Sequence, residues 1–162
     1  MSNQKITTNS AKETKEIGVA LVKQILQQKV SKTAIILSLQ GDLGAGKTTF
    51  LQGFAKGLGI EEKVLSPTFV ILKKFKITEI KNQKSKIKNT NQKLKNLYHV
   101  DCYRLKNEKD LEVLGFKEII SNPQNIVAIE WPEKIEKILP KEIILIKFQH
   151  YAENHRTLTI RE

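Results

Sequence analysis

The amino-acid sequence predicts an α/β fold, with one domain over residues 1–162 in which helices flank a mostly parallel central sheet. Three observations lead to this prediction. Short apolar runs, which are typical of strands buried on both faces, alternate with segments of helical periodicity. Two strand-like segments close the chain as an antiparallel pair. The length of 162 residues suits a single domain, and 40% apolar residues are enough to form its core.

The predicted elements follow one another from residue 11 to residue 161. We expect a helix over 11–29, because apolar residues recur at helical spacing after a capping box that starts at Ser10. The run 33–39 predicts a strand, and apolar residues at helical spacing from Phe50 to Leu58 predict a second helix. The remaining predictions are strands over 69–75, 97–100 and 126–129, short helices over 110–116 and 132–139, and the closing pair over 142–149 and 156–161.

The net charge of +11 is concentrated in one segment. Residues 73–96 hold nine lysines and one acid, Glu79, which gives +8 and leaves +3 for the rest of the chain. We place a Lys/Asn-rich insert at about 76–96. Residues 73–96 contain no arginine and a single aromatic residue, Phe75, so they lack the stacking groups of a platform for single-stranded nucleic acid. A solvated hairpin or loop is therefore favoured, and an RNA-contacting arm stays as the alternative.

Several classes of protein are disfavoured by the composition. The longest apolar runs are far too short to cross a bilayer. The polar N-terminus has no apolar region of the kind found in secretory signals, and the single cysteine, Cys102, excludes an internal disulfide. We therefore expect a cytoplasmic protein that has no membrane partner.

The stretch GDLGAGKTTF, residues 41–50, carries the strongest motif of the sequence. Gly41, Gly46, Lys47 and Thr48 fit the pattern G-x-x-x-x-G-K-[ST], which defines a P-loop between a strand and a helix. Glycines let backbone N–H groups turn toward phosphate oxygens, and the following helix adds its free N–H groups and its positive dipole end. The Lys47 ammonium can reach the β- and γ-phosphates, and the Thr48 hydroxyl can bind a Mg²⁺ ion. The sequence thus predicts a P-loop NTPase-like domain.

Two predicted strands end in a carboxylate. LYHVD ends at Asp101 and IVAIE ends at Glu130. In an open α/β sheet ligands lie beyond the carboxyl ends of the strands, so both acids should lie where the phosphates bind. A P-loop enzyme needs such groups to hold Mg²⁺ and to orient the attacking water. The residues alone leave open which of the two acids serves the metal.

The chain resembles the TsaE family, the small P-loop ATPases required for tRNA threonylcarbamoyladenosine synthesis in bacteria. The resemblance rests on GDLGAGKTTF, SPTF, YHVDCYRL, DLEVLGF and IEWPEK in one collinear order. It implies ATP and Mg²⁺ as cofactors, with the other proteins of the synthesis complex as partners and tRNA bound through that complex. The long lysine-rich connection departs from the family, whose members cross here by a short hairpin.

The resemblance also implies roles for matching residues. Lys47, Asp101 and Glu130 would be catalytic, and Thr48 with Glu130 would hold Mg²⁺. Asp101 would lie near the γ-phosphate, and Trp131 either packs in the core or covers the site. The expected nucleotide-binding residues are Ala11, Gly41, Gly44, Ala45, Gly46, Lys47, Thr48, Thr49, Thr68, Asp101 and Arg156.

The function that we expect is a Mg²⁺-dependent ATPase subunit for the modification of adenosine 37 in tRNAs that read codons beginning with A. Only three arginines are present and none stands at an obvious finger position, so hydrolysis by the chain alone should be slow. Two alternatives remain. One is a small P-loop kinase, although the sequence offers no arginine-bearing lid. The other is an RNA-binding module that depends on the lysines of the insert.

Overall fold

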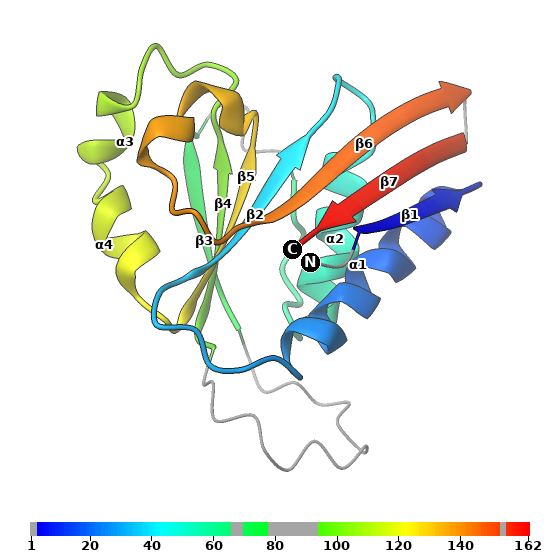
Figure 1. The fold of residues 1–162 in the computed structure, drawn as a ribbon, viewed down its shortest axis with the longest axis horizontal. Helices are drawn as coiled ribbons and strands as arrows, with labels where there is room; N and C mark the ends of the chain where they lie inside the picture. Colours follow the sequence, from blue (N-terminus) through cyan, green and yellow to red (C-terminus); the bar gives the residue numbers. More distant parts are fainter. Residues whose placement is uncertain (1–2, 66–69, 78–93, 153–154) are drawn as a thin grey trace.

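The structure is a computed structural model that describes residues 3–65, 70–77, 94–152 and 155–162. These residues form an α/β fold around one seven-stranded mixed sheet, with the strand order β1-β7-β6-β2-β5-β4-β3 (Figure 1). The strands are β1 (Asn3–Thr8), β2 (Ile35–Gln40), β3 (Leu72–Lys76), β4 (Asn96–Asp101), β5 (Asn125–Glu130), β6 (Ile144–Ala152) and β7 (His155–Arg161). The helices are α1 (Ala11–Ile25), α2 (Lys47–Gly57), α3 (Lys109–Glu112) and α4 (Phe116–Ser121), with 3-10 turns η1 (Pro132–Lys134) and η2 (Glu136–Ile138).

The centre of the sheet is parallel and its edges are antiparallel. β2 pairs in parallel with β5 and β6, and β5 pairs in parallel with β4. β3 closes one edge antiparallel to β4, while β6, β7 and β1 form an antiparallel group at the other edge. The predicted parallel core and C-terminal pair are therefore confirmed.

β1 is an element that the sequence reasoning missed. It pairs antiparallel with β7, from Asn3 opposite Arg161 to Thr8 opposite Arg156. Its sequence NQKITT has one large apolar residue, Ile6, because an edge strand needs to bury only part of its surface. The sequence of β1 therefore has no apolar periodicity that would indicate a strand.

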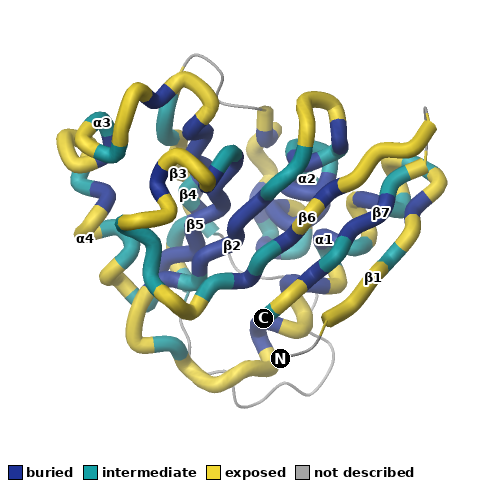
Figure 2. The backbone as a smooth tube through the Cα atoms, turned by 45° about the horizontal axis from the view of Figure 1, so that its top comes forward, coloured by how far each residue is buried: buried dark blue, intermediate teal, exposed yellow. Residues whose placement is uncertain are grey.

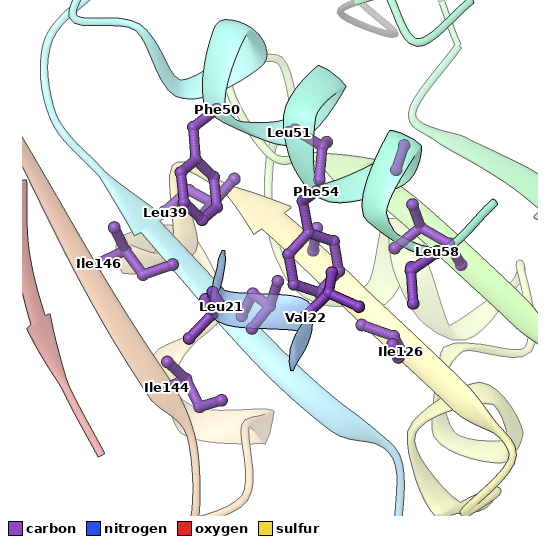
Figure 3. Packing of buried hydrophobic residues seen from close by; sticks show 14 of the residues in the cluster. Leu21, Val22, Leu39, Phe50, Leu51, Phe54, Leu58, Ile126, Ile144 and Ile146 are labelled. Carbon is purple, nitrogen blue, oxygen red and sulfur yellow. The ribbon is translucent and has the colours of Figure 1, made fainter. Parts of the chain in front are cut away.

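The core lies in two clusters, one on each face of the sheet. α1 and α2 cover the first, in which Phe50 and Phe54 of α2 pack with side chains of α1, β2, β5 and β6 (Figure 3). The second cluster lies under α3, α4 and the 3-10 turns. The central strands β2 and β5 are the most completely buried part of the backbone (Figure 2). Such burial on both faces explains their continuous apolar sequences.

α1 and α2 approach each other at backbone distance. A Cβ atom on Gly53 of α2 would lie 2.0 Å from the carbonyl oxygen of Lys15, and one on Gly18 of α1 would lie 2.4 Å from that of Phe50. Only glycine fits at such contacts. This close packing fixes the start of α1 beside the start of α2.

The remaining differences from prediction concern boundaries and short helices. α1 ends at Ile25 instead of residue 29. The helix predicted over 110–116 is two short helices, α3 and α4, separated by Gly115 in the left-handed conformation with φ 69°. The helix predicted over 132–139 is replaced by η1 and η2, because Ile135 between them has non-helical backbone angles.

Two predicted segments lie partly outside the described residues. The strand predicted over 69–75 begins at Leu72, and Phe69 is among the residues that the structure does not describe. The same holds for residues 78–93 of the Lys/Asn-rich insert. Within the described parts of the chain, none of the helices has the length and apolar character that crossing a membrane requires.

Candidate functional site

The loop over residues 41–46 links β2 to α2 and has the backbone of a P-loop. Gly46 precedes α2 with φ 102°, a conformation that favours glycine, and no side chain caps the helix. A Cβ at this position would also lie 2.8 Å from Cδ of Arg156. The first turn of α2 therefore presents its N–H groups without a capping side chain, which is the arrangement that binds anions.

Lys47 is folded back over this loop. Its Nζ donates hydrogen bonds to the carbonyl oxygens of Gly41, at 2.7 Å, and Asp42, at 2.9 Å, and lies 4.6 Å from the centre of the Trp131 ring. Burial lowers the pKa of the Lys47 ammonium, and the negative charges of Glu130 and Asp101 oppose that shift. Among the described residues Lys47 forms no ion pair, so its ammonium group is available to bind an anion in the loop.

The two predicted acids lie side by side, as expected. Asp101 and Glu130 are paired in the parallel register of β4 and β5, at the carboxyl ends of both strands. Leu97 and Ile126 of the same strands belong to the cluster under α1 and α2, so strand alternation turns Asp101 and Glu130 to that face. They are 8% and 4% exposed.

Each of the two carboxylates has a defined partner. Oε1 of Glu130 accepts a hydrogen bond from Oγ1 of Thr48, at 3.4 Å, and lies 2.9 Å from Nε2 of His99. Oδ1 of Asp101 accepts a hydrogen bond from the backbone N–H of Tyr103, at 2.9 Å. The Thr48 hydroxyl and the Glu130 carboxylate thus form a pair of hard oxygen donors, the type that Mg²⁺ prefers.

Arg156 reaches the loop from β7. A Cβ on Gly46 would lie 3.0 Å from its Nε, and Nε and Nη1 of Arg156 are buried without a hydrogen-bond partner among the described residues. Buried N–H donors without partners are costly unless an acceptor arrives. Its position therefore fits an anionic ligand in the loop.

The start of α1 completes this side of the loop. Ala11 is the first and an exposed residue of α1, after the capping residue Ser10. One turn later, Cγ2 of Thr14 would lie 3.9 Å from a Cβ on Gly46. The structure thus brings the first turn of α1 near the loop.

A cavity of about 400 Å³ lies above these groups. Its lining contains seven of the predicted site residues: Gly44, Gly46, Lys47, Thr48, Thr49, Asp101 and Glu130. Leu43, Tyr103 and Trp131 also line it, and the first two were not predicted. Ala45 is buried in the core, Gly41 contributes a carbonyl to Lys47, and Thr68 lies outside the described residues.

Trp131 has two contacts that combine its two expected roles. It packs against the second cluster, and its ring also lies beside the Lys47 ammonium and 5.2 Å from the Tyr103 ring. Its φ of 58° is the only positive φ of a non-glycine residue in the described ranges. Such a conformation costs about 1–3 kcal/mol and clusters at functional sites.

Metal and thiol chemistry of other kinds finds no support. The described residues contain no group of three or more His, Cys, Asp or Glu side chains that could hold a metal ion. Mg²⁺ needs fewer, because one or two carboxylates and the phosphates of its ligand suffice. Burial raises the pKa of the Cys102 thiol to about 12, which disfavours the reactive thiolate form.

The fold and this site define the chain as an α/β protein of the P-loop class. The family model for the threonylcarbamoyl adenosine biosynthesis protein TsaE matches residues 8–158. The chain therefore belongs to the TsaE family, which takes part in tRNA threonylcarbamoyladenosine biosynthesis.

Similar proteins agree with this assignment. The tRNA threonylcarbamoyladenosine biosynthesis protein TsaE of Bacillus subtilis (strain 168) is 36% identical over 159 residues, which are 98% of this chain and 85% of that protein. The protein of the same description from Haemophilus influenzae is 35% identical over 128 residues, covering 79% of this chain and 71% of that one. The crystal structure of Bacillus subtilis YdiB superposes with a TM-score of 0.69 at 31% identity, over 98% of this chain and 84% of that chain.

Proposed function

We propose that this chain binds ATP with Mg²⁺ and hydrolyses it, as a subunit of the machinery that adds the threonylcarbamoyl group to adenosine 37 of tRNA. One observation carries the proposal. Two cationic side chains, the buried Lys47 and the partly buried Arg156, meet at the P-loop, and neither forms an ion pair with a described residue. A site that collects positive charge around free helix N–H groups suits a polyphosphate.

The residues of the site divide the work between binding and chemistry. The N–H groups of 44–49, the Lys47 ammonium and the Arg156 guanidinium would bind the phosphates. Thr48 and Glu130 would hold Mg²⁺, which on binding neutralises the charge that develops on the transferred phosphoryl group. Asp101, paired with Glu130 across the strands, would orient the attacking water. The cavity rim of Tyr103 and Trp131 would limit the access of other water.

We expect the isolated chain to hydrolyse ATP slowly. Of its three arginines, Arg156 packs against Gly46, and Arg104 and Arg161 do not line the cavity. An arginine finger is worth about 10³–10⁵ in the rate of P-loop enzymes, and partner proteins are the natural source of it. The names of the relatives support a role in the same process, since they place those proteins in tRNA threonylcarbamoyladenosine biosynthesis.

The test combines a binding assay, a hydrolysis assay and complementation. Glu130→Ala should abolish Mg²⁺-dependent phosphate release while nucleotide still binds in the presence of EDTA, because Glu130 acts through the metal. The control is Glu136→Ala, which changes an exposed acid outside the cavity and should behave as the wild type. Unchanged hydrolysis by Glu130→Ala would contradict the proposed site.

The same assay separates this function from that of a kinase. We expect inorganic phosphate as the product with ATP, and no transfer to nucleosides or other small hydroxyl compounds. The chain should also restore threonylcarbamoyladenosine in the tRNA of cells that lack their own TsaE protein. Phosphoryl transfer to a small acceptor, together with failed complementation, would replace the ATPase by the kinase.

A further inference from the structure

The ring of His99 lies beside Glu130 in the interior of the protein. His99 is 0% exposed, in the middle of β4, and lies two residues before Asp101. Strand alternation turns its side chain to the same face as Asp101 and Glu130. In the register of β4 and β5 it stands opposite Ala128, so Glu130 is its diagonal neighbour.

The two ring nitrogens of His99 differ in their surroundings. Nε2 lies 2.9 Å from Oε1 of Glu130, whereas Nδ1 is buried and has no hydrogen-bond partner among the described residues. A proton on Nδ1 would be a buried donor without an acceptor, which is rare and costly in proteins. A neutral ring protonated at Nδ1 would also set the lone pair of Nε2 against a carboxylate oxygen. The arrangement that fits both nitrogens has the ring proton on Nε2.

This tautomer makes His99 a hydrogen-bond donor to one oxygen of Glu130. The bond occupies one direction at Oε1 and restricts the rotation of the carboxylate, whose other contact is the Thr48 hydroxyl at 3.4 Å. Both contacts are to Oε1, so no hydrogen bond from a described residue occupies Oε2. The hydrogen bond from His99 also gives the Glu130 carboxylate a polar partner. This partner is needed because the Glu130 side chain is only 5% exposed and its charge is largely removed from water.

We propose that His99 is a positioning residue, whose Nε2–H bond holds the Glu130 carboxylate in the orientation that, together with Thr48, receives Mg²⁺. The inference rests on the proposed function of the site, because it gives Glu130 the metal-binding role described above. Hydrogen bonds to a metal-binding carboxylate of this kind are worth about 10–100-fold in metal affinity or activity. His99 acts through Glu130 and does not itself touch the nucleotide.

Two amide substitutions test the donor position. The amide of His99→Gln can place an N–H group near the site of Nε2, whereas the shorter amide of His99→Asn places it near the site of Nδ1. Both remove the ring and add the same polar group, so they control for each other. Thermal unfolding of both variants shows whether the fold is kept.

The first readout is the Mg²⁺ concentration that gives half-maximal binding of a fluorescent ATP analogue, measured beside its affinity in EDTA. We expect His99→Asn to raise this Mg²⁺ concentration about 10–100-fold, with an unchanged affinity in EDTA, and His99→Gln to restore most of the loss. An unchanged Mg²⁺ requirement in His99→Asn would overturn the inference. Equal losses in both variants, with and without Mg²⁺, would also overturn it, because they would indicate a purely structural ring.

The second readout needs no nucleotide and starts from the wild-type protein. Imidazole ¹⁵N spectra of the wild-type protein, in which the His99 signal is assigned by its loss in His99→Asn, should show the His99 ring protonated at Nε2. Glu130→Gln should shift that resonance and no other histidine strongly. A His99 ring that carries its proton on Nδ1 and none on Nε2 would overturn the inference.

The two assays separate the failure of this inference from the failure of the proposed function. Absence of any nucleotide binding by the wild-type protein would overturn the proposed function. The imidazole spectrum would then still decide whether His99 donates to Glu130. Nucleotide binding that depends on Mg²⁺ but not on the amide position at residue 99 would leave the proposed function in place and remove His99 from it.

Discussion

The two faces of the sheet differ in how they are built. On one face α1 and α2, of 15 and 11 residues, meet through glycine contacts over a large apolar cluster. On the other face α3 and α4, of 4 and 6 residues, and two 3-10 turns cover a smaller cluster. Lys47, Asp101 and Glu130 all belong to the α1–α2 face, and Trp131 is the contact between the two faces at the cavity.

This difference indicates that the α1–α2 face is the more rigid part of the molecule. Long helices in backbone contact hold the P-loop amides and the strand-end acids in fixed positions, as a phosphate site requires. Short helices with exposed residues between them have few contacts to lose, so the α3–α4 face is the part of the molecule that should open first. The two faces can be compared directly by experiments on each.

The largest expected effect concerns Cys102, which lies in the cluster of the α3–α4 face. Burial raises the pKa of its thiol from 9.0 to about 12, so at pH 8 the native protein holds ~10³-fold less thiolate than the unfolded chain. As pH rises toward 12, the thiolate fraction and the rate of alkylation should rise with it. Alkylation by iodoacetamide, followed by mass spectrometry, measures the rate in the native state and in urea. Because Cys102 is the only cysteine, each modified molecule reports this one site.

The outcome decides whether the α3–α4 face opens by itself. Phe116→Ala removes a buried ring from the same cluster, whereas Gly53→Ala perturbs the contact between α1 and α2. When the two variants are compared at the same free energy of unfolding, alkylation should be faster in Phe116→Ala. Equal rates in the two variants would show that the faces open together, and the comparison would fail.

The next effect is on the α1–α2 face. Gly53→Ala adds a Cβ that would lie 2.0 Å from a backbone oxygen of Lys15 and 2.5 Å from its Cα, so the two helices must separate. We expect a loss of about 1–3 kcal/mol in the free energy of unfolding, measured by urea denaturation. Lys56→Ala, an exposed change on the same helix, is the control and should leave stability unchanged. A loss as small as that of the control would mean that the helix contact is not what holds this face together.

The smallest effect is expected at the turn between α3 and α4. Val113 is 88% exposed, and Val113→Ser should change stability by no more than about 0.5 kcal/mol. Val30→Ser, at an exposed apolar residue after α1, is the matched control. Unfolding in urea measures both. A much larger loss at Val113 would show that the α3–α4 turn is packed against another part of the chain.

The parts of the fold and site that could be predicted from sequence depend on neighbours in the chain. The step from β2 through the P-loop into α2 is encoded within residues 35–57, where an apolar run, glycines and helical periodicity follow directly. The convergence of Asp101 and Glu130 followed from a general rule on parallel strands, and the register confirms it.

The parts that could not be predicted depend on tertiary pairing. β1 carries no apolar pattern, because it gains its hydrogen bonds at the edge beside β7. The approach of Arg156 to Gly46 was expected only from the family resemblance, since the two positions are 110 residues apart and meet across the sheet. The bond between His99 and Glu130 needs the register of two strands, although the spacing of His99 and Asp101 on one strand was a signal that could have been used.

The contact between Trp131 and Lys47 has a practical consequence. Trp131 is the only tryptophan of the chain, and its indole lies beside the ammonium group expected to swing toward a bound anion. Trp131 is therefore an intrinsic fluorophore that lines the cavity. Ultraviolet emission from this single indole should follow filling of the loop in real time, without a dye or an added label.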